Sequence, residues 1–486
     1  MRERSSIGGR EDGSRRGRPL FMDAAVGLPI PGTKYSALTH SDPLIKSTSD
    51  EDFVSTSRHS SASAATSPGG YLSDRTTSSA ASSNTQHSAA SSPFSSSPWH
   101  HHEQSANTAT ATADLFPSGT GLVGSLVREE GHIYSLAAGA RGLLYTGSDS
   151  KNIRVWRDRR EFSGFKSSSG LVKAIVLSAN GHRVFSGHQD GKIRVWAPSP
   201  KDPATHKRVS TLPRLKDLLK ASFHPSAARR RRRGGAVRIR HTDAVSCLCL
   251  SEDESLLYSG SWDRTIKAWR IADSQCVDSI DAHDDAVNAV VAAFKGLVFS
   301  GSADGTVKVW RRETTTAKKE SVTGHAAEKT LMKQDSAVTA LSINVDAGVV
   351  YAGSSDGVVN CWDWGRRLEH CGTLRGHAAA VLCLAAAGAG STLLFSGSAD
   401  KTICVWRREE ETGAHSCLSV LTAHTGPVKC LAVQADAADG KEGEEDCGGA
   451  RRRWVVYSGS LDKSVKVWKV AEPAAGQVAE PMFDTY

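Results

Sequence analysis

Short runs of alternating apolar and polar residues recur between about residues 120 and 470, and each run ends at a tryptophan. The same phrase returns seven times, ending at Trp156, Trp196, Trp269, Trp310, Trp362, Trp406 and Trp468. In the copy at 298–310, VFSGSADGTVKVW, apolar positions alternate on both sides of the step Asp304-Gly305. Alternation with period two around Asp-Gly is typical of a β-hairpin. Each phrase therefore predicts two short strands joined by a tight turn.

The residue at the tip of this turn is either glycine or basic in every copy. These residues are Lys151, Gly191, Arg264, Gly305, Gly357, Lys401 and Lys463. Glycine suits a backbone with positive φ. The basic residues are expected to lie exposed at the turn.

A further apolar run precedes each phrase, such as AVSCLCL at 244–250 and AVLCLAA at 380–386. One position in these runs is small in all copies, namely Ser135, Ala174, Cys247, Ala289, Ala340, Cys383 and Cys430. Small residues fit where strands converge on a narrow axis, as they do in propellers and tapered barrels. These runs are therefore predicted to be the innermost strands.

Successive tryptophans of the repeat lie 40 to 73 residues apart. A period near 40–45 residues with four strands per unit is the WD-repeat pattern. Over roughly residues 120–470 the chain thus resembles the WD-repeat (WD40) family. The expected fold class is all-β, a seven-bladed β-propeller preceded by a long disordered N-terminal tail.

The resemblance also implies a buried hydrogen-bond network in each blade. Its members are a His before the innermost strand, a Ser or Thr on the second strand, the turn Asp and the Trp. In the third blade these are His241, Asp263 and Trp269, with either Ser259 or Ser261, which share one strand face. The matching residues elsewhere are His283, Asp304 and Trp310; His377, Asp400 and Trp406; and His424, Asp462 and Trp468.

Three blades depart from this pattern. Blade one has Glu129 in place of His and Ser150 in place of Asp. Blade two has Ser168 and blade five has Gln334 at the His position, although both keep the turn Asp. A half-made buried network is costly, so these three blades are expected to be the less rigid ones.

The ring needs a strand from outside the repeats to close. The tail after Trp468 contains two prolines and little apolar alternation, so it offers no good fourth strand for the last blade. The segment GLVGSLVRE at 121–129 precedes the first blade and lacks a partner there. It is expected to pair with the last blade, which would remove unpaired strand edges.

Composition divides the chain into three parts. Residues 1–115 are rich in Ser, Ala and Thr and cannot bury enough apolar surface to fold, so they are predicted to be a disordered tail. Residues 116–471 form the propeller, with insertions near 198–240 and 435–453, and 472–486 form a C-terminal tail. The steps Ser67-Pro68, Ser92-Pro93 and Ser97-Pro98 either suit a proline-directed kinase or reflect composition alone.

The first insertion contains a possible helix at 212–222 and a basic run, Arg229 to Arg233. Such a run is a nuclear import signal, a phosphate-binding patch or a solvated loop. The second insertion has an acidic half beside a basic half, which favours a self-screened surface loop.

The chain has 486 residues, 39% of them hydrophobic, and a net charge of +8. Its ten cysteines include no C-x-x-C pair, which favours buried core residues in a reducing compartment. It contains no secretory signal and no run of 18 apolar residues. A protein of the nucleus or cytoplasm without a membrane segment is expected.

No catalytic, cofactor-binding or metal-binding residues are predicted. Gly119, Gly121 and Gly124 match the dinucleotide fingerprint by spacing, but a predicted strand follows them where a helix is required. His100 to His102 lie in the Ser-rich tail, where they could bind a metal only weakly. The blade histidines recur at one structural position, which marks them as scaffold, so an enzyme is not expected.

The expected function is therefore protein binding. Residues just before the turn Asp should point toward one end of the central channel, and the candidates are Gln189, Trp262, Ser355 and Leu461. Trp262 is the leading one, because exposed aromatic residues are frequent binding hot spots. The alternative is that it packs on a neighbouring loop.

Several longer phrases are more specific than the repeat itself. REEGHIYSLAA, LYTGSDSKNIRVW, HKRVSTLPRLKDLLKAS and HTDAVSCLCLSEDESLLYSGSWDRTIKAWR are similar to the plant JINGUBANG-like group. That resemblance implies a plant regulatory WD-repeat protein that binds a transcription factor or signalling partner and restrains a developmental programme such as pollen germination.

Two alternatives belong to other classes. Substrate receptors of cullin-type ubiquitin ligases carry Trp-Asp-x-Arg after the repeat, whereas Trp362-Asp363-Trp364 is followed by Gly365. A nucleic-acid or ribonucleoprotein platform would use the basic run from Arg229 to Arg233.

Overall fold

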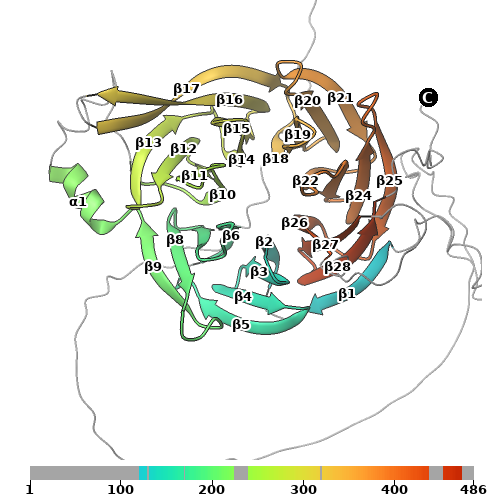
Figure 1. The fold of residues 1–486 in the computed structure, drawn as a ribbon, viewed down its shortest axis with the longest axis horizontal. Coiled ribbons are helices and arrows are strands. Elements are labelled where there is room, and N and C mark those ends of the chain that lie inside the picture. Colours follow the sequence, from blue (N-terminus) through green and yellow to red (C-terminus); the bar gives the residue numbers. More distant parts are fainter. Residues whose placement is uncertain are drawn as a thin grey trace, which may run out of the picture. The chain divides into compact units, whose positions relative to one another are not determined.

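The computed structural model describes residues 120–127, 131–168, 170–223, 239–317, 320–436 and 452–472. In these ranges the strands form seven four-stranded antiparallel sheets, arranged as blades around a common axis (Figure 1). The predicted seven-bladed β-propeller is confirmed. The N-terminal tail, the run Arg229 to Arg233, Glu129 and most of the insertion at 435–453 lie outside the described residues.

The first four blades follow the chain from inner to outer strand. Blade one contains β2 (Ile133–Gly139), β3 (Leu143–Ser148), β4 (Asn152–Arg157) and β5 (Arg160–Lys166). Blade two contains β6 (Val172–Leu177), β7 (Val184–His188), β8 (Ile193–Pro198) and β9 (His206–Leu212). Blade three contains β10 (Val245–Leu250), β11 (Leu256–Ser261), β12 (Thr265–Arg270) and β13 (Gln275–Asp281). Blade four contains β14 (Val287–Ala293), β15 (Leu297–Ser302), β16 (Thr306–Ala317) and β17 (Glu320–Lys333).

The last three blades complete the ring. Blade five contains β18 (Val338–Asn344), β19 (Val349–Ser354), β20 (Val358–Asp363) and β21 (Glu369–Arg375). Blade six contains β22 (Val381–Ala386), β23 (Leu393–Ser398), β24 (Thr402–Arg408) and β25 (His415–Thr422). Blade seven contains β26 (Val428–Ala435), β27 (Arg453–Ser460), β28 (Ser464–Ala471) and β1 (Gly121–Val127).

Two features extend beyond the ring of blades. The helix expected at 212–222 is present as α1 (Leu215–Phe223). It lies outside the ring, and the long β16–β17 hairpin extends past the edge of blade four (Figure 1). The length of this hairpin was not predicted, because its outer half lacks apolar alternation.

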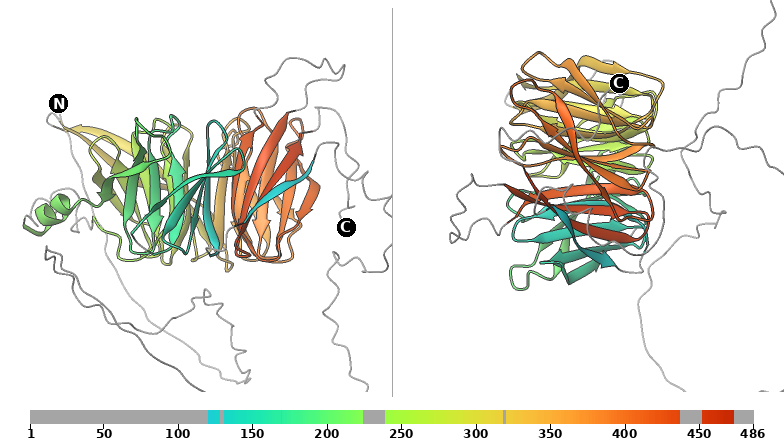
Figure 2. Two further views of the ribbon diagram at one scale, coloured as in Figure 1. Left: turned by 90° about the horizontal axis from the view of Figure 1, so that it is seen from below. Right: turned by 90° about the vertical axis from the view of Figure 1, so that its right-hand side faces the viewer.

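The ring closes as predicted. β1 pairs antiparallel with β28, from Gly121 opposite Lys469 to Val127 opposite Ser464. The two strands lie side by side although they come from opposite ends of the propeller sequence (Figure 2). Leu126 of β1 is buried in the cluster between blades seven and one, so closure also completes a hydrophobic seam.

Neighbouring blades approach each other through a glycine on the second strand. A Cβ at Gly301 would lie 2.5 Å from Val338 Cγ1 on the next inner strand, well inside van der Waals contact. The same contact recurs at every seam, between Gly147 and Val172, Gly187 and Val245, Gly260 and Val287, Gly301 and Val338, Gly353 and Val381, Gly397 and Val428, and Gly459 and Ile133.

The small residue of each inner strand lies opposite the same glycine. Cys247 pairs with Gly260, for example, and Ala289 with Gly301. Each second-strand glycine is thus covered by a small side chain of its own blade and an aliphatic one of the next. This packing explains why one position of every inner strand is occupied by a small residue.

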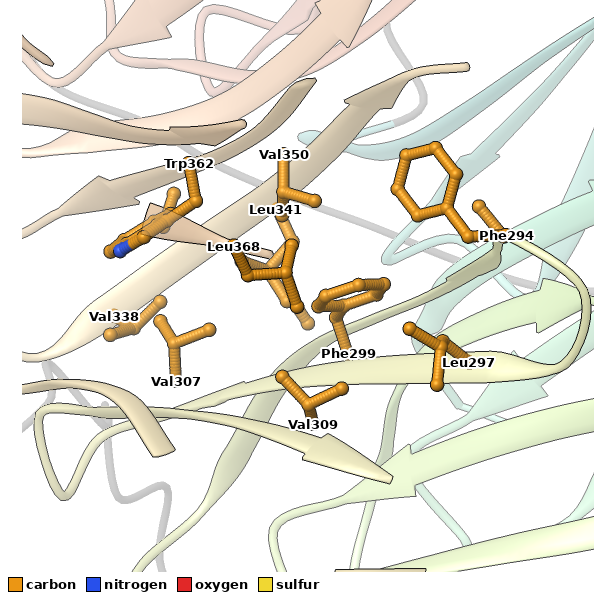
Figure 3. Packing of buried hydrophobic residues seen from close by; sticks show 13 residues of the cluster. Phe294, Leu297, Phe299, Val307, Val309, Val338, Leu341, Val350, Trp362 and Leu368 are labelled. Atoms are coloured by element: carbon orange, nitrogen blue, oxygen red, sulfur yellow. The ribbon is translucent and has the colours of Figure 1, made fainter. Parts of the chain in front are cut away.

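Hydrophobic clusters fill the seams between blades. Each of the seven clusters draws residues from two adjacent blades. At the seam between blades four and five, Phe299 and Val309 face Val350 and Trp362 across the gap between the sheets (Figure 3). The repeated Trp is therefore a core residue that faces the preceding blade.

Removal of β1, residues 121–127, is expected to destabilise or aggregate the protein, because the edge of β28 and the Leu126 seam would be exposed. Size-exclusion chromatography and thermal unfolding measure this. Leu122→Ser serves as the control, since Leu122 is 48% exposed and its change should be tolerated. A monomeric deletion variant that unfolds cooperatively at the original temperature would contradict the closure.

Gly301→Ala is expected to lower the free energy of unfolding by about 1–3 kcal/mol, because the new methyl overpacks the contact with Val338. The matched control is Gly324→Ala on β17, where nothing lies within 4 Å of the added Cβ. Denaturant unfolding of both variants should separate them. Equal stability of the two would show that the seam can relax.

Candidate functional site

The turn between the second and third strands of blade three is held by a buried hydrogen-bond chain. Trp269 Nε1 donates to Ser259 Oγ over 2.8 Å, and Ser259 Oγ lies 2.8 Å from His241 Nε2. His241 Nδ1 lies 3.0 Å from Asp263 Oδ2. Because an ionised carboxylate only accepts, Nδ1 carries the proton and Nε2 accepts from the serine. The chain fixes the turn against the blade core.

The electrostatics of this pair follow from burial and hydrogen bonding. Burial lowers the pKa of His241, although Asp263 opposes that shift, so the ring is neutral. Burial disfavours ionisation of Asp263, but hydrogen bonds from His241 and Thr265 outweigh it and hold its pKa well below the usual range. An anionic Asp therefore accepts from a neutral His.

The same chain recurs in blades four, six and seven. The His–Asp distances are 3.0 Å for His283 and Asp304, 2.9 Å for His377 and Asp400, and 2.7 Å for His424 and Asp462. The hydroxyls that link each His to Trp310, Trp406 and Trp468 belong to Ser300, Ser396 and Ser458. The pKa of Asp400 and that of Asp462 are lowered to about 2, because hydrogen bonds from the His and a neighbouring hydroxyl outweigh burial.

The two serines of the motif have different roles. Ser259 bridges His241 and Trp269. Ser261 accepts from the backbone N–H of Asp263 and donates to the carbonyl of Asp243. The first serine thus ties the core to the turn, and the second holds the turn backbone itself. Sequence alone had left the choice between them open.

Blade two builds its network from a different histidine. The His position is Ser168, but His188 stands where the other blades have the second serine or its equivalent. His188 Nε2 lies 2.8 Å from Ser186 Oγ, which accepts from Trp196. Burial and the nearby Arg194 lower the pKa of His188 to about 3. The sequence carries a signal of this exchange, since SGHQDG at 186–191 replaces the usual SGSxD.

Blades one and five retain only parts of the network. In blade one Trp156 Nε1 donates to Thr146 Oγ1 over 3.2 Å, and Ser148 bonds Ser150. In blade five Asp356 accepts from Ser354, while Ala352 replaces the bridging serine. Gln334 in the same blade turns to its own loop, where Nε2 donates to Ser336 O.

The turn tips adopt left-handed backbone in all seven blades. Glycine supplies it in blades two, four and five, and basic residues adopt it in the rest, with Arg264 at φ 70° and Lys401 at φ 73°. The basic tips are exposed, as expected. We call this end of the propeller, where the inner strands begin and the Asp turns lie, the turn face.

The predicted partner-binding residues all lie on the turn face. Gln189 and Ser355 are exposed, while Trp262 and Leu461 are half-buried. The backbone carbonyl of Leu461 accepts a hydrogen bond from His132 Nδ1. They sit on four different blades, and no contact joins any two of them among the described residues.

Trp262 has a close cationic neighbour that the sequence did not reveal. Lys173 Nζ lies 3.9 Å from the centroid of the Trp262 ring and 5.7 Å from that of Tyr134. Burial, and then the nearby Lys429 ammonium, lower the pKa of Lys173 to about 8, although Asp243 opposes this shift. A cation–π contact across two blades thus orients the Trp262 side chain.

A β-bulge explains why Lys173 points to this face. The second residue of every inner strand sits in a register shift. From this position Asn288 Nδ2 donates to Val338 O over 2.8 Å, and Thr339 Oγ1 donates to Val381 O. These bonds link one inner strand to the next. At the junction of blades two and three the bulge residue is Lys173, whose side chain reaches Trp262 instead.

Charge is unevenly distributed around the turn face. The inner positions of blades seven, one and two carry Lys429, Tyr134 and Lys173. The loops before the inner strands of blades three to five carry the exposed acids Asp243, Asp284, Asp285 and Asp335. A partner would therefore meet the aromatic and basic side chains of blades seven, one and two beside Asp243, and further acids on blades four and five.

The described residues contain no group of three His, Cys, Asp or Glu side chains that could hold a metal ion. No described helix has the length and apolar composition needed to cross a membrane. The nine described cysteines are free thiols. The arrangement on the turn face is suited to non-covalent recognition by stacking, hydrogen bonding and charge.

Asp263→Ala is expected to lower the free energy of unfolding by about 1–3 kcal/mol, because His241 and the amide of Thr242 lose a buried acceptor. Asp149→Ala is the matched control, since Asp149 is the exposed turn residue of blade one. Thermal unfolding of both variants measures the difference. Equal melting-temperature losses would refute the special role of Asp263.

Comparisons with known proteins agree with this geometry. The family model "WD domain, G-beta repeat" matches residues 159–197, 236–270, 274–311, 322–363, 368–407 and 415–469. An uncharacterized WD repeat-containing protein of Schizosaccharomyces pombe is 26% identical over 49% of this chain and 70% of its own length. Protein ROOT INITIATION DEFECTIVE 3 of Arabidopsis thaliana is 26% identical over 40% of this chain and 45% of its own length. A ribosome biogenesis protein WDR12 homolog of Nematostella vectensis is 24% identical over 48% of this chain and 46% of its own length.

The chain therefore spans less than half of the last two relatives. The six matched segments cover more than half of the chain, and they fall on the blades. Together with the ring of seven four-stranded sheets, they show that this protein belongs to the WD40-repeat family.

Proposed function

We propose that the protein is a non-catalytic interaction scaffold that binds a partner protein on the turn face around Trp262. The observation that carries this proposal is the Trp262–Lys173 pair, in which an indole and a cation from neighbouring blades meet at 3.9 Å. Tryptophans in such partly buried settings are frequent hot spots of protein interfaces. The exposed acids Asp284, Asp285 and Asp335 on blades four and five would fix the orientation of the partner.

The partner we propose is a transcription factor or signalling protein of a plant cell, in the nucleus or cytoplasm. The similarity of several long phrases to the plant JINGUBANG-like group supports this assignment, as does the presence of an Arabidopsis protein among the relatives. Restraint of a developmental programme such as pollen germination would follow from capture of such a partner.

A substrate receptor of a cullin-type ubiquitin ligase is less well supported. The positions that would carry the adaptor motif are engaged within the chain. Trp364 stacks on Phe294 with ring centroids 4.9 Å apart, and Asp363 Oδ1 accepts from Gly365 N. We therefore do not assign this role.

A nucleic-acid or ribonucleoprotein platform is the second candidate. It is favoured by the run Arg229 to Arg233 and by the relative that is named a ribosome biogenesis protein. Binding of this kind would depend on salt and on nucleic acid.

Trp262→Ala is expected to weaken partner binding by about 2 kcal/mol or more, because the hot-spot ring is removed while the fold keeps its core. Affinity purification with mass spectrometry, with nuclease present, compares the intact protein with this variant. The control is Trp364→Ala, since Trp364 is 38% exposed and lies at the opposite end of the propeller.

Capture of a regulatory protein by the intact protein and by Trp364→Ala, with its loss from Trp262→Ala, supports the proposal. Equal capture by all three would remove Trp262 from the interface. A set of ribosomal proteins that nuclease removes would favour the second candidate.

A further inference from the structure

The second strand of each blade carries one buried aromatic residue at a fixed position. Tyrosine and phenylalanine alternate there around the ring: Tyr145, Phe185, Tyr258, Phe299, Tyr351, Phe395 and Tyr457. Each ring faces the seam toward the next blade. Because the number of blades is odd, strict alternation around the ring is impossible. Blades seven and one, which are neighbours, therefore both carry tyrosine at this position.

At three tyrosine seams the hydroxyl bonds a histidine from the outermost strand of the next blade. Tyr258 Oη lies 3.0 Å from His325 Nε2, and the rings form an edge contact with an 84° interplanar angle. The other two pairs have the same geometry, with 3.0 Å between Tyr145 and His206 and 2.9 Å between Tyr351 and His415. At these three tyrosine seams, a histidine ring therefore fills the space next to the tyrosine hydroxyl.

The phenylalanine seams are filled by apolar residues instead. Phe185 packs in a cluster with Ile271, Phe299 in one with Leu368, and Phe395 in one with Val470. A seam with a tyrosine hydroxyl is thus filled by a polar histidine, and a seam without one is filled by an apolar residue. This follows because a buried hydroxyl needs a hydrogen-bond partner.

The fourth tyrosine seam has a hydroxyl but no histidine among the described residues. The three histidines pair with the residue two places after the blade Trp, as His415 does with Arg408. In blade one that residue is Asp158, which already forms the two-residue turn between β4 and β5. The β4–β5 hairpin is one residue pair too short to place a histidine next to Tyr457.

A cavity of about 770 Å³ lies at this seam. Tyr457, Gln434 and Lys469 line it from blade seven, and Arg141 and Arg159 from blade one. At the seam where His325 is present, the cavity beside Tyr258 measures about 350 Å³. Both volumes fall in the range of ligand pockets, and the larger cavity beside Tyr457 has room for a ring with flanking peptide backbone.

The hydroxyl of Tyr457 can donate a hydrogen bond to a ring nitrogen of a bound ligand. Gln434 Nε2 lies 2.9 Å from Tyr457 Oη and can only donate. The tyrosine oxygen therefore accepts this bond, and its own hydrogen remains for an acceptor such as imidazole Nε2. Asp158 and Arg159 at the edge of the cavity offer polar partners to a peptide backbone, whereas the carboxylate of Asp436 is paired with Lys469.

We propose that the cavity beside Tyr457 is a socket for the histidine side chain of a partner peptide. At the seam between blades seven and one, the peptide would supply the imidazole that a histidine of β9, β17 or β25 supplies at the other three tyrosine seams. This site lies on the side opposite the turn face, at the end of the blades where β4 and β5 turn, so it is independent of binding at Trp262.

The test uses the full chain and two probes, acetyl-Gly-His-Gly-amide and acetyl-Gly-Phe-Gly-amide, with affinity measured by saturation-transfer NMR. The His peptide is expected to bind at least tenfold more tightly than the Phe peptide. Tyr457→Phe should weaken the His peptide roughly three- to tenfold, the effect of one hydrogen bond. Tyr258→Phe is the matched control and should leave the affinity unchanged, because His325 already fills that seam.

A second variant keeps the test independent of how Tyr457→Phe folds. It replaces residues 158–159 with the segment 408–415 of blade six, which lengthens the β4–β5 hairpin and brings its own histidine. This variant should fold and lose the His peptide. Equal binding of both peptides to the intact protein, or undiminished binding to the hairpin variant, would overturn the proposal.

Discussion

The close approach of each inner strand to a second-strand glycine of the preceding blade is the constraint on which this ring depends. A side chain at Gly260 or Gly301 would meet the next blade inside van der Waals contact. The seven copies of this contact set the spacing between sheets, and the hydrophobic clusters fill the space that it leaves. Since the last copy joins Gly459 to Ile133, the closing seam obeys the same rule as the others.

The hydrogen-bond chains position the turns on this frame. Each chain runs from a core tryptophan to a turn carboxylate, so the surface loops inherit the rigidity of the core. In blade two, His188 reaches the bridging serine from the second strand, while the turn carboxylate of Asp190 is bonded by Arg194 instead of a histidine. Trp262 follows directly on Ser261, so its backbone is held by the turn while Lys173 holds its ring. The candidate binding surface is therefore a product of two neighbouring blades.

Periodicity along the chain predicted the strands, the blade count and the closing role of β1, because these depend on local alternation and on the need to pair every edge. It did not predict contacts between repeats. The partner of Gly301 lies 37 positions further along, at Val338, and the partner of Tyr258 lies on a hairpin 67 positions away. The choice between Ser259 and Ser261 depended on which of the two lies within reach of His241 and Trp269, and the Trp262–Lys173 pair depended on a β-bulge. Such features are fixed by three-dimensional packing, which a single repeat does not encode.

The pairing of β1 with β28 has a consequence for synthesis on the ribosome. The first strand of the ring is made about 340 residues before the strand that it pairs with. At translation rates of roughly 5–20 residues per second, it waits on the order of 20–70 s without its partner. During that interval β1 is unpaired, and the nascent ring is an open arc whose two terminal blades expose the apolar faces that the closed ring packs together. Protection of this arc from neighbouring polypeptides, rather than the folding of any single blade, would then set how much intact protein the cell obtains.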